Sequence, residues 1–382
     1  MSTLERLSVQ SRIPKRRGGS GFLAHAGGLA RYFGFKHARE LMPQERSYTF
    51  AKVASAVSAQ METEPALVYY ASAAPAHLPR DIRALVKQPE VGEFGLMVVG
   101  SEESIAEVLL LRTLATILTE WGLPIVRVRL NALGDKDSKQ RFERELGGFL
   151  RKHYDSLDDD CRRATAANPG AAYYCERDEC RSIVMSGPRA MNFLSEKSRA
   201  HFREVLEYVE GLGLPYELDD FLMGDDRESR VTFSVDAPDT ELVLGAYGGR
   251  YDDHARKIGG KTAVCAASIY FRKGGLSAAR FAEAPKTAAP KVYFIQLGVR
   301  AKLVGFTVVD IVRRAGVPMT QSFDARSLAP QLIAAKAAGT HYLIIMGARE
   351  ALDGTVIIRT LDNSTQQTVA LKELPRALKS LR

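Results

Sequence analysis

The sequence predicts an α/β protein, with an α+β body followed by a smaller α/β domain that contains a mixed sheet. Three observations support this class. Residues 104–120 carry apolar side chains on a broad helical face. Short apolar runs at 231–235 and 240–244 are typical of two strands joined in a hairpin. From residue 291 onward, strand-like and helix-like segments alternate along the chain.

In the body, helices are expected where apolar residues recur with helical spacing. Ser101 is the expected N-cap of the helix that stops before Gly122, and Gly213 followed by Pro215 ends the last helix. The expected helices cover 22–35, 48–61, 104–120, 137–154 and 195–212. Short apolar or alternating runs predict strands at 67–71, 94–99, 125–130, 231–235, 240–244 and 263–271.

The C-terminal part follows a different pattern. Residues 281–290, FAEAPKTAAP, combine small residues with prolines and predict a semi-stiff linker. The domain at 291–382 is expected to contain strands at 292–297, 318–323, 342–346 and 356–360, and helices at 303–315, 328–338 and 371–381. Alternation of this kind favours a small α/β domain with a mixed sheet.

Length and composition are those of an ordinary soluble globular protein. The chain has 382 residues, 46% hydrophobic and 26% charged, which is enough for two or three domains with their own cores. No apolar run reaches the roughly 18 residues of a membrane span, so we expect no membrane partner. The first residues lack the apolar core of a secretory signal, which favours a cytoplasmic location.

The net charge of +8 and the pI of about 9.2 favour a polyanionic partner such as RNA. Part of this excess lies in a basic N-terminal arm at residues 1–21, which contains Lys15, Arg16 and Arg17. A solvated tail is the more ordinary interpretation of such an arm. An arm that contacts RNA phosphates is the sharper alternative, and these three residues are then candidates for RNA binding.

Five short stretches form an ordered set along the chain. They are LNALGD at 130–135, SEKSRAHF at 195–202, GGRYD at 248–252, DARSL at 324–328 and YLIIMG at 342–347. This set resembles histidyl-tRNA synthetases, which are class II aminoacyl-tRNA synthetases. The resemblance covers most of the chain from about Tyr48, whereas the first 47 residues match poorly.

The resemblance implies a class II catalytic-core body at 22–280, with an antiparallel sheet, helices and an insertion at about 136–200. It also implies an anticodon-binding-like domain at 291–382 and a homodimer. In this domain, Arg326 and Lys336 are the candidates for RNA binding. Activation of histidine would need ATP and Mg²⁺, because fixed cations must stabilise charge on the transferring phosphate.

Several positions depart from what activation needs. The arginine of motif 3 is matched by Arg272, which would be the catalytic residue of an active protein. The glycine before it is matched by Ile269, and we expect this branched side chain to block the nucleotide. In motif 2 the family's arginine is replaced by Ala76, although Arg80 and Arg83 follow and could supply a displaced cation.

The histidine pocket also differs from the family's pattern. Its expected members are Tyr251, Arg250, Glu93, Met97, Met223 and Glu228. The family's glutamate that would hold the substrate ammonium is matched by Met97, which carries no charge. We expect Met97, Met223 and Glu228 all to line the pocket.

Cys161, Cys175 and Cys180 raise the question of a metal. The Cys-x4-Cys spacing is at the edge of what zinc sites use, and no histidine completes the set. The sequence alone therefore predicts no metal.

These observations favour a protein that keeps the synthetase fold without activating histidine, retained for binding tRNA or another RNA or for a regulatory role with a protein partner. One alternative is an active histidine–tRNA ligase whose motifs have drifted. A second alternative is a protein like the regulatory subunit of ATP phosphoribosyltransferase, although that relative generally lacks an anticodon-binding domain.

Overall fold

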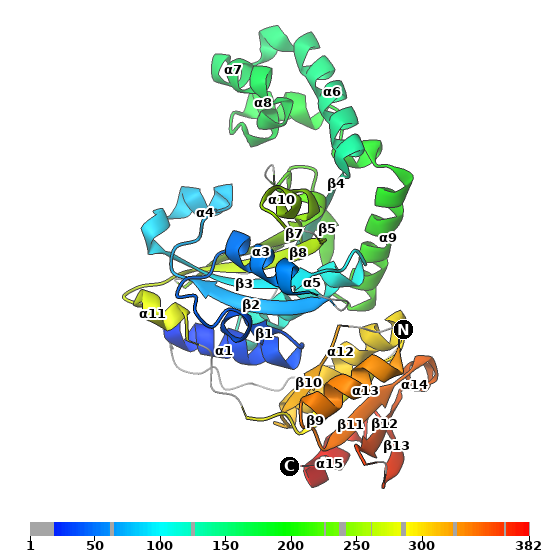
Figure 1. The fold of residues 1–382 in the computed structure, drawn as a ribbon. Coiled ribbons are helices and arrows are strands. Elements are labelled where there is room, and N and C mark those ends of the chain that lie inside the picture. The colour runs from blue at the N-terminus through cyan, green and yellow to red at the C-terminus, as the bar shows by residue number, and fades with distance from the viewer. Residues whose placement is uncertain are drawn as a thin grey trace.

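The computed structural model contains two sheets, a large one in the body and a smaller one in the C-terminal part (Figure 1). It describes residues 19–61, 65–123, 127–224, 227–236, 242–260, 262–283, 288–323, 327–362 and 364–381. Lys15, Arg16, Arg17 and Arg326 lie outside the described residues. Among the described residues, no helix is both long and apolar enough to cross a bilayer.

The large sheet has eight strands in the order β1-β2-β3-β8-β7-β6-β4-β5. Its strands are β1 Lys36–His37, β2 Ala66–Ser72, β3 Val91–Val99, β4 Arg127–Gly134, β5 Tyr216–Leu218, β6 Ser229–Asp236, β7 Val243–Arg250 and β8 Val264–Arg272. The outermost pairs, β1 with β2 and β4 with β5, are parallel, and all other neighbours are antiparallel. The fold class predicted for the body is confirmed.

The GGRYD stretch lies at the centre of this sheet. The sequence analysis placed the end of a strand at Leu244, whereas β7 continues through Gly248 and Gly249 to Arg250. Glycine fits here because the neighbouring strands approach closely. A Cβ at Gly248 would lie 2.5 Å from the ring of Phe233, and one at Gly249 would lie 2.6 Å from the carbonyl oxygen of Val231.

The two faces of the large sheet are covered differently, because side chains alternate along each strand. On one face, Leu96 and Val98 pack with α1 Gly19–Tyr32, α5 Ile105–Glu120 and α9 Glu196–Gly211 in the main core. On the other face, Met97 and Val99 pack with α3 Phe50–Gln60 and α10 Asp252–Lys257. The second face is also where a cavity lies beside α3.

Helix α5 is the most buried of the body helices, as its broad apolar face predicts. Its N-cap is Ser104, not Ser101 as the sequence suggested. The Ser101 hydroxyl instead accepts a hydrogen bond from the backbone N–H of Glu103, over 3.3 Å, in the turn that leads into the helix.

The segment between β4 and α9 forms a helical arm that extends away from the large sheet (Figure 1). It contains α6 Lys136–Lys152, α7 Asp159–Ala167, the 3-10 turn η3 Pro169–Tyr174 and α8 Asp178–Met185. Asp158 caps α7, because its side chain accepts hydrogen bonds from the N–H groups of Asp160 and Cys161. The arm has a small core of its own.

The smaller sheet has five strands in the order β10-β9-β11-β12-β13. They are β9 Val292–Gln296, β10 Met319–Gln321, β11 Tyr342–Met346, β12 Thr355–Thr360 and β13 Gln366–Ala370, with helices α12 Val299–Arg314, α13 Leu328–Ala337 and α14 Ala348–Asp353. The first three strands in this order are parallel and the last two pair antiparallel, so the predicted mixed sheet is confirmed.

The sequence analysis missed β13 and overestimated the last helix. Strand β13, QQTVA, is polar and largely exposed at the sheet edge, so it has no apolar pattern to reveal it. The helix expected at 371–381 is reduced to a short α15, Leu374–Ala377, followed by a 3-10 turn.

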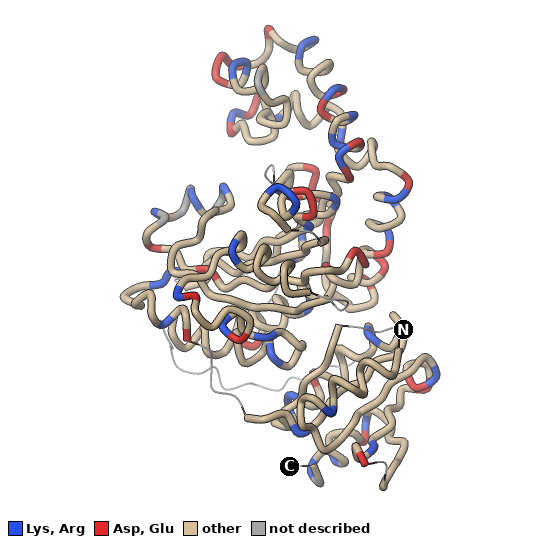
Figure 2. Tube along the Cα trace, in the orientation of Figure 1, with Lys and Arg blue, Asp and Glu red and all other residues tan. Residues whose placement is uncertain are grey.

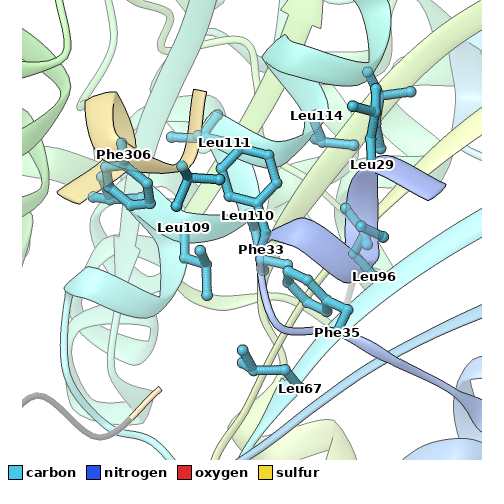
Figure 3. Close-up of a cluster of buried hydrophobic side chains, with 14 of the residues drawn as sticks. Leu29, Phe33, Phe35, Leu67, Leu96, Leu109, Leu110, Leu111, Leu114 and Phe306 are labelled. Atoms are coloured by element: carbon cyan, nitrogen blue, oxygen red, sulfur yellow. The ribbon is translucent and has the colours of Figure 1, made fainter. Parts of the chain in front are cut away.

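The C-terminal part packs against the body through apolar and charged contacts. Phe306 of α12 lies 6.3 Å from Phe33 between ring centroids, and both belong to the core drawn in Figure 3. Arg112 of α5 pairs with Asp310 of α12, and Arg313 binds Glu120 over 2.9 Å. These contacts fix α12 beside α5.

A glycine-to-alanine pair tests the close strand packing. Gly248→Ala should destabilise the protein by about 1–3 kcal/mol, because the new Cβ overlaps Phe233 and the backbone of Ala266. The matched control is Gly28→Ala within α1, where nothing lies within 4 Å of the new Cβ. Gly28→Ala should stabilise by about 0.5–1 kcal/mol through helix propensity. Chemical denaturation measures both, and equal effects at the two positions would contradict the packing described.

Candidate functional site

A cavity of about 640 Å³ opens on the sheet face beside α3 and beneath the helical arm. Its walls are rich in arginine and aromatic residues. The polar and aromatic lining includes Phe50, His77, Arg80, Arg83, Glu93, Arg129, Tyr173, Tyr174, Glu176, Arg181, Asp219, Phe221, Arg227, Glu228, Tyr247, Tyr251 and Tyr270. A cavity of this size and composition is suited to a small polar or aromatic ligand.

Glu93 and Ser268 line the floor of the cavity and belong to a hydrogen-bonded triad on three adjacent strands, whose third member, Tyr70, lies in the core. The hydroxyls of Tyr70 on β2 and Ser268 on β8 donate to Oε1 of Glu93 on β3, over 2.9 and 2.7 Å. Tyr70 reaches Glu93 because Gly95 has no side chain, and a Cβ there would lie 2.4 Å from the tyrosine ring. Burial raises the pKa of Glu93, while the bonds from Ser268 and Tyr70 favour the ionised carboxylate.

A second acid closes the side wall. Glu228 accepts a hydrogen bond from the hydroxyl of Tyr251 over 3.0 Å, and both are largely buried. The guanidinium of Arg227 lies 5.8 Å from the centre of the Tyr251 ring, and the ring of Phe50 lies 5.0 Å from it. This wall therefore joins α3 to the loop that precedes β6.

Cations reach the cavity from two sides. Arg80, at the start of α4 Arg80–Leu85, pairs with Glu176 of the arm over 3.2 Å and lies 5.4 Å from the centre of the Tyr174 ring. Arg83 follows on the same short helix. Arg129 is bound by Asp219 over 2.9 Å, so its charge is largely balanced. The loop expected to carry a displaced cation thus reaches the cavity.

Of the predicted pocket residues, Glu93, Met223, Glu228 and Tyr251 line the cavity. Met97 does not: it is fully buried in the core between the sheet and α3, next to Val68 and Ala266 across the strands. Met97 shares its sheet face with Glu93, and α3 covers it. The expectation that Met97 lines the pocket is therefore not met.

Arg250 and Arg272 also lie away from the cavity lining. Arg250 is fully buried on the face of the sheet that α5 covers. Arg272 ends β8 at the outer edge of the body, where its side chain is 43% exposed and 3.9 Å from Glu90. Lys336 is exposed on α13 of the C-terminal part.

The expected block of the nucleotide by Ile269 is wrong. Its side chain is fully buried in the core on the helix side of the sheet, together with Phe94. The adjacent residues Ser268 and Tyr270 face the cavity instead, as alternation along β8 requires. A sequence pattern alone does not show which face of the sheet position 269 occupies.

Sequence reasoning missed the aromatic and cationic residues that the arm contributes. Tyr173, Tyr174 and Arg181 belong to a segment that was treated as an insertion, with no link to the pocket. No local pattern signals this link, because it depends on how the arm folds back over the sheet. Arg129 alternates with apolar residues on β4, which is the one available hint.

Arg250, from the GGRYD stretch, holds the body together. Its guanidinium donates to both carboxylate oxygens of Glu107 on α5, over 2.8 and 2.6 Å, and to the carbonyl oxygen of Ser101 over 2.7 Å. His201 of α9 binds the same carboxylate over 2.7 Å. Both Arg250 and Glu107 are fully buried.

The charge of Glu107 is secured by these partners. Burial alone would raise its pKa, but the charge of Arg250 and the bonds from His201 and Arg250 lower the pKa to about 2. The pair is a structural element rather than part of the cavity, because it lies on the opposite face of the sheet.

The protein has a body built on an eight-stranded, largely antiparallel sheet and a C-terminal part built on a five-stranded mixed sheet. Residues 291–381 match the family model "Anticodon binding domain". The chain is 25% identical over 313 residues to a histidine–tRNA ligase of Halothermothrix orenii, covering 77% of this chain and 73% of the relative. It is 30% identical over 280 residues to the corresponding ligase of Aromatoleum aromaticum, covering 69% and 61%.

A solved apo histidyl-tRNA synthetase of S. aureus is similar at a TM-score of 0.42 and 18% identity, over 86% of this chain and 80% of that chain. Over most of its length the chain is therefore similar to histidine–tRNA ligases.

Substitution of Glu107 tests the buried pair. Glu107→Gln should cost about 3–5 kcal/mol of stability near pH 7, because Arg250 is left buried without a counter-charge. The stabilisation from a depressed carboxylate pKa is fully present above its unfolded value near 4.5 and is lost as the pH falls through about 2. The difference between wild type and Glu107→Gln should therefore shrink from pH 4.5 towards pH 2 in denaturation experiments.

The control for this test is the double variant Glu107→Leu with Arg250→Met, which removes both charges. It should recover much of the lost stability. A constant difference between wild type and Glu107→Gln across the acid range would contradict the assignment.

Proposed function

We propose that this chain is a histidyl-tRNA synthetase-like protein that does not activate histidine and that binds tRNA or another RNA. The proposal that the chain does not activate histidine rests on two positions, those of the acid that would bind the substrate ammonium and of the motif 3 arginine. The position of the family's ammonium-binding acid is Met97, uncharged and covered by α3, and Arg272, matched to the motif 3 arginine, lies outside the cavity.

The carboxylates that do reach the cavity have other partners. Oε1 of Glu93 already accepts hydrogen bonds from Tyr70 and Ser268. Glu228 is bound to Tyr251. A ligand ammonium would share each carboxylate with the hydroxyls already bound to its Oε1.

RNA binding is supported by the C-terminal part and by the charge. The match to an anticodon-binding domain over residues 291–381 gives this part a relation to tRNA, and the net charge of +8 favours a polyanion. Basic and acidic residues are interspersed over both parts of the chain (Figure 2), so binding would rest on local contacts. On α13, Lys336 is exposed close to Ile333, which is 69% exposed.

A specific observation favours one alternative, an active histidine–tRNA ligase that uses ATP and Mg²⁺. Arg80 and Arg83 line the cavity and could hold a phosphate in place of the family's motif 2 arginine. Against this, Arg80 is already paired with Glu176. The match to an anticodon-binding domain counts against the alternative of a phosphoribosyltransferase regulatory subunit. A homodimer remains an expectation of the family resemblance, and a cytoplasmic location remains an expectation from the N-terminal sequence.

A gel-shift titration of the purified chain with bulk tRNA tests the RNA-binding role. Binding should weaken steeply as salt rises, because phosphate contacts release counterions. Lys336→Ala should weaken binding a few-fold and reduce the salt slope by about one. Lys372→Ala, at an exposed lysine after β13, is the matched control and should bind like wild type. No shift at low salt, or equal effects of the two substitutions, would contradict the role proposed for α13.

A further inference from the structure

The arm brings three cysteines together from three different elements. Cys161 lies on α7, Cys175 follows the 3-10 turn η3, and Cys180 lies on α8. Their Sγ atoms all lie within 4.8 Å of one another, and all three are free thiols. Cys161 and Cys180 are buried, whereas Cys175 is half-buried.

The sequence argued against a metal because the Cys-x4-Cys spacing is unusual and no histidine follows. The spacing limits the geometry only when the ligands form one linear motif. Here Cys161 lies on a separate helix, so the spacing between Cys175 and Cys180 does not decide whether the three thiols can bind one ion. We propose that Cys161, Cys175 and Cys180 bind one Zn²⁺ ion through three thiolates.

The three Sγ atoms fit a zinc ion after they move slightly closer together. A tetrahedral ion with Zn–S bonds of about 2.3 Å places its sulfur atoms roughly 3.8 Å apart. The cluster therefore has to contract by at most about 1 Å. On binding, each thiol releases its proton to solvent, and the three thiolates with Zn²⁺ carry one net negative charge.

The fourth ligand is a water molecule. Among the described residues, no further histidine, cysteine or acidic side chain joins the group of three. Cys175 also lines the large cavity, so solvent reaches this side of the cluster. In zinc sites with three protein ligands, as in catalytic zinc centres, water occupies the fourth position.

A bound zinc ion would cross-link elements of the arm that its small core holds together only weakly. The arm's own core is small, and it stands apart from the main core of the body. Small units of this kind often need a metal or a disulfide for stability. The ion would join α7, η3 and α8, and so would hold Tyr173 and Tyr174 of η3 in the cavity wall.

Two other states of the cluster are chemically reasonable. Buried cysteines can pack simply as small apolar side chains. Alternatively, two of the three could form a disulfide and leave one thiol. Each state predicts a different outcome in the experiment below.

The experiment uses the full chain, purified under reducing conditions, loaded with Zn²⁺ and passed through a desalting column. Elemental analysis should find one zinc per chain, and Cys161→Ser, Cys175→Ser and Cys180→Ser should each reduce retention at least tenfold. Cys265→Ala is the matched control, because Cys265 is a buried cysteine of β8 outside the cluster. This variant should retain zinc like wild type.

A measurement on the wild type alone covers the case in which a variant fails to fold. Cd²⁺ in place of Zn²⁺ should produce a thiolate-to-metal charge-transfer band that saturates at one equivalent. Zn²⁺ should also protect three thiols from alkylation, located by mass spectrometry at Cys161, Cys175 and Cys180. Absence of the band, or equal alkylation with and without zinc, would overturn the proposal. So would an intact mass, under reducing conditions, that is lower than that of the fully reduced chain by the hydrogens lost on forming one disulfide.

Discussion

The ion pair between Arg250 and Glu107 is the interaction on which the body depends. One guanidinium joins the central strand β7 to the first turn of α5, and His201 extends the same contact to α9. Both charges are fully buried, so either one alone would be costly. The pair therefore sets the position of α5 and α9 against the sheet.

This constraint changes how the GGRYD stretch is understood. Its glycines allow close strand packing, and its arginine faces the helices. Gly248 and Tyr251 line the cavity, and the hydroxyl of Tyr251 donates to Glu228 there. Most of the stretch therefore maintains the fold, and its presence indicates the family more directly than it indicates an activity. The cavity owes its character instead to the β2–β3–β8 floor, the α4 loop and the arm.

The sequence predicted the main helices, the central strands and the mixed C-terminal sheet, because each has a strong apolar pattern. It also predicted four of the cavity residues, Glu93, Met223, Glu228 and Tyr251, through a family resemblance. The prediction of cavity residues failed where it depended on which face of the sheet, or which part of a face, a residue occupies. Ile269 and Met97 are on strands that contribute cavity residues, but both side chains are buried in the core. The cysteine cluster could not be foreseen, because three separate elements meet only in the folded arm.

Histidine-dependent exchange of pyrophosphate into ATP tests the central claim most directly. The account predicts a rate at background, since the loss of one fixed cation alone lowers such rates by more than a hundredfold, corresponding to about 3 kcal/mol. A histidine-dependent rate above background would contradict the account. If Arg80→Ala abolished that rate and Arg272→Ala left it unchanged, the result would also show that a displaced arginine keeps the cavity active.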